Sequence, residues 1–243
     1  GFKYELYDDL FHTIMLKLNL KDYSVTNSNT VESAIAKSEG NNTEISILNG
    51  FFYDNLDSFI RPTLGTSIAF DNIISPTTSS DNGYFKNILI HKQYFNFSKN
   101  ILSFQTKIGN IFSFQNSEIL SDEKFSLGGR WLRGFDADGA GPRNSASSYI
   151  GGNNIITSKI DLSRPLFKNS DNPLDLKVFT DVGKVWDNKI RPSDSKESIR
   201  ASYGLGMNFY SPIGPIGLSW SFPIADENYD INRMFLFSVG NLN

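Results

Sequence analysis

The amino-acid sequence predicts an all-β fold, an antiparallel transmembrane β-barrel, on three observations. Apolar and polar residues alternate along many short segments, which is the pattern of strands with one apolar face. Aromatic residues make up 14% of the chain, including 20 Phe and 10 Tyr, and this favours strands over helices. No run approaches the roughly 18 apolar residues that a transmembrane helix needs, so a chain of this kind crosses a membrane only as a closed barrel.

The alternating segments have lengths close to the roughly 9–11 residues of a membrane-spanning strand. In chain order we expect strands at 16–20, 43–54, 65–75, 84–97, 102–113, 156–162, 176–183, 199–211, 214–224 and 234–240. Stretches rich in Asn, Ser, Gly and Asp, at 31–43, 75–83 and 187–198, are predicted to be loops.

The clearest strands form a hairpin near the C-terminus, joined by a Ser-Pro-Ile-Gly turn at 211–214. One face of this hairpin is apolar and the other is small or polar. We expect Ser202 and Ser219 to face a wet lumen, and the apolar set to contact lipid: Leu205, Met207, Phe209, Leu218, Trp220 and Phe222. A soluble sandwich or barrel produces the same alternation, so spacing alone leaves both folds open.

Aromatic residues gather at the ends of the expected strands. In outer-membrane barrels such residues form girdles at the two membrane interfaces, although the core of a soluble barrel also uses them. The residues expected in girdles are Tyr94, Phe95, Phe97, Trp186, Tyr210 and Phe222.

Composition argues against several classes of function. The net charge is −3 and the sequence has no block of basic residues, so it offers no positively charged patch for nucleic-acid binding. There is no cysteine, His12 and His91 are the only histidines, and no His/Asp/Glu cluster has the spacing of metal ligands. Neither histidine lies near a serine in a recognisable nucleophile elbow. We therefore expect no enzyme activity and no cofactor.

The chain reads as one domain, 1–243, with one long loop at about 125–155. This loop is too long and too rich in glycine for a barrel turn. Loops of that length inside a compact domain are usually functional or disordered. The loop therefore marks the place to look for function.

Motifs in and after this loop occur in a fixed order that resembles the BamA family of outer-membrane β-barrel assembly factors. The resemblance covers roughly residues 54–240, but this chain does not end in the aromatic residue that is typical of the family. The elements that carry the resemblance are Phe125 with Gly128-Gly129, Leu132-Arg133-Gly134-Phe135, Gly141-Pro142-Arg143, Gly151-Gly152-Asn153, Phe179-Thr180-Asp181-Val182-Gly183, and the hairpin from Ser211 to Pro215.

The resemblance implies that the loop folds back into the barrel lumen, where Arg133 pairs with acids on the inner wall. Alternation along 156–162 and 176–183 places Asp161 and Asp181 on the inward face. A guanidinium can bond two carboxylates, and a glycine beside it permits a sharp turn. The plainer alternative is that Arg133 is solvated and Asp181 caps a turn. The loop-lock motif consists of Leu132, Arg133, Gly134, Phe135, Asp161 and Asp181.

The function implied by the resemblance is to insert and fold β-barrel proteins in the outer membrane of a Gram-negative bacterium. The implied partners are outer-membrane lipid, unfolded outer-membrane proteins as clients, and accessory lipoproteins of an assembly complex. A two-partner secretion transporter, which shares the arginine loop, and a passive outer-membrane pore are the alternatives.

The resemblance also implies an incomplete barrel. A family barrel has about sixteen strands, whereas at about 9–11 residues per span plus turns this chain holds about eleven or twelve. We expect these residues alone not to close into a barrel.

Overall fold

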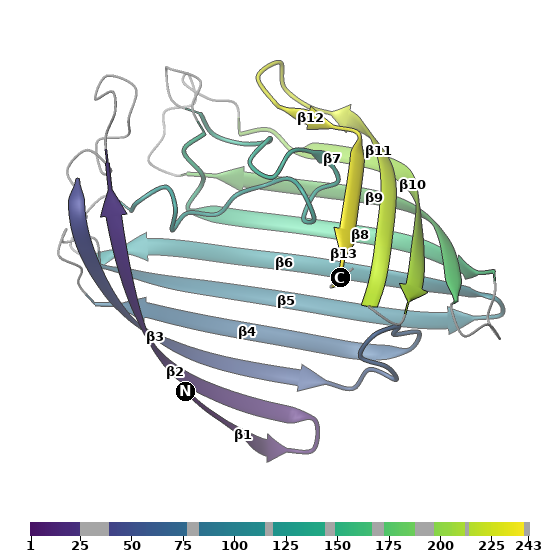
Figure 1. Ribbon diagram of the computed structural model, residues 1–243, viewed down its shortest axis with the longest axis horizontal. Coiled ribbons are helices and arrows are strands. Elements are labelled where there is room, and N and C mark those ends of the chain that lie inside the picture. Colours follow the sequence, from purple (N-terminus) through teal and green to yellow (C-terminus); the bar gives the residue numbers. More distant parts are fainter. Residues whose placement is uncertain are drawn as a thin grey trace.

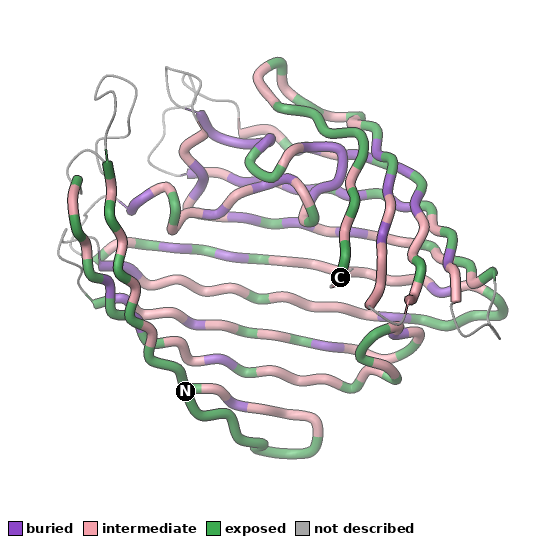
Figure 2. Tube along the Cα trace, viewed as in Figure 1, coloured by how far each residue is buried: buried purple, intermediate pink, exposed green. Residues whose placement is uncertain are grey.

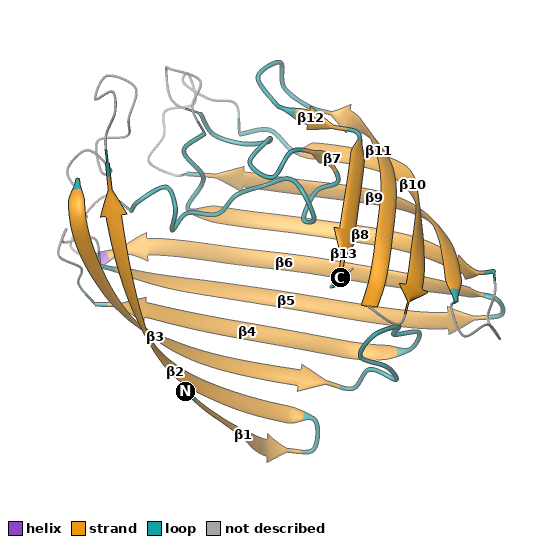
Figure 3. Cartoon of the chain, viewed as in Figure 1, coloured by secondary structure: helices purple, strands orange, loops and turns teal. Residues whose placement is uncertain are grey.

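The computed structural model describes residues 1–24, 39–76, 83–114, 119–143, 149–166, 173–187, 197–211 and 214–240. These residues form one curved antiparallel sheet of eleven strands and a small sheet of two (Figures 1 and 3). The strands of the large sheet are β1 (Phe2–Tyr7), β2 (Leu10–Tyr23), β3 (Gly40–Asp54), β4 (Gly65–Ser75), β5 (Tyr84–Phe97), β6 (Asn100–Ser113), β8 (Asn154–Pro165), β9 (Leu174–Trp186), β10 (Arg200–Ser211), β11 (Gly214–Ala225) and β13 (Phe235–Val239). The small sheet pairs β7 (Gly134–Phe135) with β12 (Asn232–Arg233).

Each strand of the large sheet pairs with the next one along the chain, and β1 and β13 are its two edges. The predicted all-β antiparallel fold is confirmed, with eleven strands where about eleven or twelve were expected. Most expected boundaries agree within a few residues, but β1 was not predicted. The polar residues 40–43, expected in a loop, extend β3 because they pair with the end of β2. No helix in the described residues has the length and apolar character needed to cross a membrane.

The two faces of the sheet differ in chemistry. On β2 the outward residues Leu16, Leu18 and Leu20 are 69%, 63% and 77% exposed. On β10 the outward Tyr203 and Leu205 are also exposed, whereas the alternate residues Ser202, Gly204 and Gly206 are buried (Figure 2). Because successive side chains in a strand point to opposite faces, this alternation places apolar side chains outside the curve and polar ones inside it.

The connections at the two ends of the strands differ in length. The two-residue connections 8–9, 98–99 and 212–213 all join strands at one end of the sheet, as do 55–64 and 166–173. The three longest connections, 24–39, 114–153 and 187–199, all join strands at the other end, as do 76–83 and 226–234. Outer-membrane barrels typically have their shortest turns at one end and their longest loops at the other. The turn 211–214 that the sequence predicts falls at the short end, and its central residues lie outside the described part of the chain.

Two expectations about the lumen are wrong. Ser202 and Ser219 point inward as expected, but they are only 0% and 5% exposed. Gly134 of the 114–153 connection lies close against Ser202, and Ser219 lines a small cavity beside Arg133. Tyr94, expected in an aromatic girdle, is 7% exposed and lines a small internal cavity with Tyr210. Both tyrosines lie on the inward face of their strands, so position at a strand end was a poor guide to the girdles.

The buried apolar core lies mainly in the 114–153 connection and on the strands beneath it. Its members are Tyr84, Ile111, Ile119, Phe125, Leu127, Leu132, Phe135, Ala140, Ile155 and Val185. Figure 1 shows this connection inside the curve of the sheet, beside β8 to β13. The inner wall here is covered by the chain's own loop.

Adjacent residues on β2 test the assignment of the two faces. Leu16 points outward and Met15 points inward, and both are exposed. In a full-length protein reconstituted in lipid vesicles, Leu16→Arg should lower the free energy of unfolding by about 2–4 kcal/mol if it lies near the bilayer midplane. Met15→Arg, facing the lumen, should cost less than about 1 kcal/mol. Equal losses in urea titrations of the two variants would contradict a lipid-facing outer surface.

Candidate functional site: the arginine loop and its acidic partners

Arg133 lies at the tip of the 114–153 connection and is 4% exposed. Its Nε and Nη2 donate to the two oxygens of Asp181 at 2.7 and 2.5 Å. Its Nη1 and Nη2 donate to the two oxygens of Asp161 at 3.1 and 2.5 Å. The backbone N–H of Arg133 also donates to Asp181, at 2.9 Å. A planar guanidinium is the side chain whose donors can hold two carboxylates in this way.

The register of β8 and β9 brings the two acids together. Asp161 opposes Phe179, and Asp181 opposes Lys159, so both acids lie on the inner face of neighbouring strands. Asp181 is 0% exposed and the Asp161 side chain 16%. Lys177 Nζ lies 3.5 Å from Asp161 and supplies a second positive charge. The structure therefore places Arg133, Asp161 and Asp181 in direct contact, at the position that the loop-lock motif requires.

Burial and charge act against each other at Arg133. Burial by itself lowers the pKa of this guanidinium, because a low-dielectric environment disfavours the charged form. The charges and hydrogen bonds of Asp161 and Asp181 outweigh burial, and the pKa of Arg133 lies above its ordinary value. Arg133 therefore stays positively charged in its buried position.

An aromatic ring supports the guanidinium from below. Cζ of Arg133 lies 3.5 Å from the centroid of the Phe179 ring, close enough for a cation–π contact. Gly204, on the next strand, makes room for this ring, since a Cβ at that position would lie 2.4 Å from Phe179 Cζ. Phe179 belongs to the sequence motif that contains Asp181, but its role beneath Arg133 follows only from the structure.

The backbone around Arg133 is held by the strands of the C-terminal hairpin. The hydroxyl of Ser202 donates to the carbonyl oxygen of Arg133. Gly134 has φ +97, a conformation that residues with a Cβ rarely adopt, and a Cβ there would lie 3.1 Å from Ser202 Cβ. The turn after Arg133 therefore needs glycine both for its backbone angle and for the close approach to β10.

The two apolar members of the motif anchor the tip on either side of Arg133. Leu132 is 0% exposed and Phe135 is 1% exposed, and both belong to the buried core. Burial of side chains of this size stabilises the folded loop by about 1.5–3 kcal/mol each. Packing as well as charge thus holds the tip.

A second group of contacts involves residues that sequence reasoning did not single out. The segment 226–233, between β11 and β13, pairs with the tip, with Asn232 opposite Phe135 and Arg233 opposite Gly134. Asp136 N donates to Ile231 O at 2.9 Å, and Ile231 N donates to Gly139 O at 2.9 Å. The tip is therefore a neighbour of the chain segment that leads into β13.

The segment 226–233 is itself anchored by a buried ion pair. Arg200, at the start of β10 and 1% exposed, donates through Nε to Asp230 at 2.8 Å, and its Nη2 donates to Tyr229 at 3.1 Å. No motif marks this pair in the sequence. The sequence indicated only that Arg200 occupies a polar position in the alternation of its strand.

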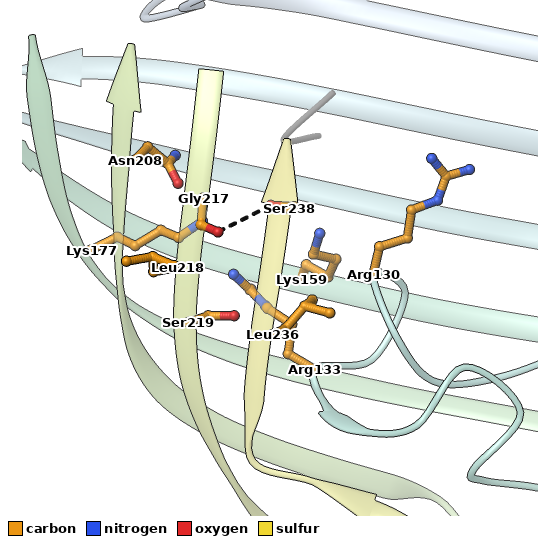
Figure 4. A pocket seen from close by; sticks show the side chains of 10 residues that line it. All are labelled: Arg130, Arg133, Lys159, Lys177, Asn208, Gly217, Leu218, Ser219, Leu236 and Ser238. Carbon is orange, nitrogen blue, oxygen red and sulfur yellow. Dashed lines mark hydrogen bonds between the residues drawn. The ribbon is translucent and has the colours of Figure 1, made fainter. Parts of the chain in front are cut away.

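Beside the contacts of the tip with β10, a cavity of about 50 Å³ lies between the loop and the inner face of the sheet. Figure 4 shows its lining, with Arg133 and Arg130 on the loop, Lys159 and Lys177 on β8 and β9, and Ser219 and Leu236 on β11 and β13. Lys159 Nζ lies 3.2 Å from Gln105 Oε1. The cationic side chains that line this cavity, Arg130, Arg133, Lys159 and Lys177, outnumber the two acids that Arg133 contacts.

The geometry is that of a structural contact between charged groups. Both acids are occupied by the arginine. Within the described ranges, no group of three His, Asp or Glu residues lies close enough to hold a metal ion. The arrangement can hold a loop in place, and its strength depends on how completely water is excluded from the three charges.

Comparison with known proteins places the chain in a family. Residues 6–242 match the Omp85 superfamily domain. A SAM50-like protein of Schizosaccharomyces pombe is 31% identical over 147 residues, which are 57% of this chain and 31% of that protein. The outer membrane protein assembly factor BamA of Nitratidesulfovibrio vulgaris is 27% identical over 213 residues, which are 85% of this chain and 26% of that protein.

A solved structure shares the fold. The crystal structure of BamA from Haemophilus ducreyi lacking POTRA domains 1–3 superposes with a TM-score of 0.81 at 20% identity, over 97% of this chain and 52% of that chain. The chain thus spans about a quarter to a third of the length of the two curated relatives. The match to the family model covers nearly every residue, and on that ground the chain is a member of the Omp85 superfamily.

Proposed function

We propose that this chain is the barrel portion of an assembly factor that inserts and folds β-barrel proteins in an outer membrane. The observation that carries the proposal is the buried contact of Arg133 with Asp161 and Asp181, made by the long loop inside an Omp85 barrel. The similarity to an outer membrane protein assembly factor supports the same function. The activity requires no catalytic residue and no cofactor, because strand pairing and release from water supply the free energy of insertion.

The working surface in this proposal is the free edge of β13. Gly240 N donates to Pro215 O, and Ser221 N donates to Met234 O, so the even-numbered residues of β13 pair with β11. The backbone N–H and C=O groups of Phe235, Phe237 and Val239 consequently point to the free edge. An edge of this kind is a template on which an extended polypeptide can add as a new strand.

The loop lock supports this edge through the segment 226–233. The tip of the loop pairs with that segment, and the segment leads directly into β13. We infer that the contact of Arg133 with both acids keeps the loop inside the lumen and holds the approach to the edge strand in one position. Clients are unfolded outer-membrane proteins, and accessory lipoproteins are the further partners that we propose.

We propose the outer membrane of a Gram-negative bacterium as the location, on the similarity to the bacterial assembly factor. The similarity to a fission-yeast protein shows that relatives of this chain also occur outside bacteria. The outward apolar face and the open sheet suit any membrane that receives new β-barrels.

The loop lock is tested by a double-mutant cycle in a full-length protein. Arg133→Ala should destabilise the loop by about 3–5 kcal/mol, because it removes the guanidinium from the buried Asp181 and leaves Asp161 with Lys177 alone. Arg133→Lys should restore only part of this, since one ammonium cannot reach both carboxylates as a fork. Combining Arg133→Ala with Asp181→Ala should cost less than the sum, with a coupling of about 1–3 kcal/mol measured by protease accessibility of the loop.

Arg130→Ala is the matched control for this cycle. Arg130 is exposed, lies on the same loop and contacts no acid among the described residues. Its loss should leave protease accessibility and insertion of client barrels unchanged. A coupling near zero between Arg133 and Asp181, with both single variants fully active, would remove the lock from the proposed mechanism.

The edge strand is tested by removing one backbone donor. Phe237→Pro deletes an N–H that points to the free edge and leaves the ladder between β13 and β11 intact, a position where proline is tolerated. Insertion of client barrels into vesicles should slow by about two- to tenfold, the effect of one hydrogen bond. Phe237→Ala keeps the N–H and should insert clients at close to the original rate.

Unchanged insertion by Phe237→Pro would argue against pairing on this edge. The alternative function is a secretion transporter, which passes its client through the lumen. That function would be favoured if Phe237→Pro left insertion unchanged and Arg133→Ala altered the passage of a soluble client.

A further inference from the structure

The connection between β3 and β4, residues 55–64, is a compact structure of its own. The carboxylate of Asp57 accepts hydrogen bonds from the backbone N–H groups of Thr63 and Leu64 at 2.7 and 3.1 Å, and from the Thr63 hydroxyl at 2.6 Å. Asp57 N also donates to Leu64 O at 3.1 Å. These bonds close a loop that contains Arg61. We call residues 55–64 the strap.

Arg61 joins the strap to strands on the far side of the curved sheet. Its Nε and Nη2 donate to the two oxygens of Asp175, at the start of β9, at 3.1 and 2.5 Å. Its Cζ lies 5.3 Å from the centroid of the Tyr210 ring on β10. The Asp175 side chain is 4% exposed, and a two-pronged bond between a guanidinium and a carboxylate is among the stronger hydrogen-bonded contacts in proteins.

The strap therefore crosses the inside of the sheet. Asp175 and Tyr210 lie on the inner face, and Figure 1 shows the strap between the ends of β3 and β4 and the ends of β10 and β11. This is the end at which the two-residue connections lie, which we call the short-turn end. Pro62 of the strap lines a small internal cavity together with Asp161 and Asp175. The strap thus covers, from the short-turn end, one of the two acids that Arg133 holds.

A second cavity separates the strap from the strands that it joins. Its volume is about 430 Å³, and most of its lining is apolar, with Phe59 and Ile60 on the strap and Phe52, Ala69 and Ile90 on β3, β4 and β5. Phe59 and Ile60 are nevertheless 91% and 59% exposed. The strap thus leans away from its own strands and leaves an apolar space behind it.

Two interactions act on the strap in opposite directions. The pairing of Arg61 with Asp175 holds the strap across the inside of the sheet. Burial of Phe59 and Ile60 in the cavity would draw the strap back against β3 to β5, because apolar side chains gain free energy on leaving water. A short segment with two competing sets of contacts is an element with two positions.

We propose that the strap is a gate at the short-turn end of the lumen, held closed by Arg61 and opened when the strap moves back into the cavity behind it. The closed gate keeps water and ions at this end away from Asp161 and Lys177, which line the small cavity. The open gate admits ions and small polar molecules to the inner wall of β6, β8 and β9. The gate rests on contacts within this chain and not on the proposed function.

The gate is tested by the reactivity of a thiol placed behind the strap. Ser103, inward on β6, lines the same small cavity as Pro62, and the chain has no cysteine. In a full-length protein in lipid nanodiscs, Ser103→Cys should react slowly with a charged methanethiosulfonate reagent. Adding Arg61→Ala should raise this rate at least about tenfold, because a charged two-pronged bond that holds the closed position is lost. Arg61→Lys should raise the rate less, since an ammonium still attracts Asp175 but cannot form the fork.

A variant of the apolar side of the strap should act in the opposite direction. Phe59→Ser together with Ile60→Ser removes the side chains that the cavity would bury, so it should slow the labelling of Ser103→Cys. Combined with Arg61→Ala, the two serines should bring the rate back toward that of the original strap.

Lys99→Cys is the matched control. Lys99 is exposed on the short connection 98–99, at the same end of the sheet and outside the strap. Its labelling rate should be the same in every variant, and resistance to protease checks that the barrel stays folded.

Three results would overturn the gate. These are an unchanged labelling rate of Ser103→Cys in Arg61→Ala, an equal rise in the labelling of Lys99→Cys, and a pair of serines that opens the site as much as Arg61→Ala does. Insertion of client barrels is measured separately, so failure of the gate and failure of the proposed assembly function are distinguishable.

Discussion

The contact on which the inside of this molecule depends is the pairing of one buried guanidinium with two carboxylates. A buried cation without partners would cost several kcal/mol, and two neighbouring acids without a cation would repel one another. Arg133, Asp161 and Asp181 therefore require each other. Because the arginine is on the 114–153 connection and the acids are on β8 and β9, this mutual requirement places the connection against the sheet. The core residues Leu132 and Phe135 then pack around the tip.

Backbone pairing connects the Arg133 contact to the C-terminal strand β13. The tip of the connection forms the small sheet β7–β12 with the segment 226–233, and the Arg200–Asp230 pair anchors that segment from below. The edge strand β13 follows immediately. A displacement of the loop would break these pairings, whereas the ladder between β11 and β13 depends on other residues. In the proposed function, loop position and edge geometry are connected by this short segment.

The outer surface follows a simpler rule, since an apolar side chain at every second position suits contact with lipid. Glycine and serine on the inner face of β10 and β11 allow the loop to approach, and leucine, tyrosine and tryptophan cover the other side.

Much of this structure was determined by the sequence alone. Period-2 alternation identifies nearly all the strands and the direction of each side chain, because a strand leaves a residue only two faces to choose from. Alternation and motif order together brought Arg133, Asp161 and Asp181 into one hypothesis. Register between distant strands and the path of long connections were decided only by the tertiary structure. Phe179 beneath the arginine, the burial of Ser202 and the Arg200–Asp230 pair all depend on residues far apart in the chain that meet through packing, and no local pattern encodes such distances.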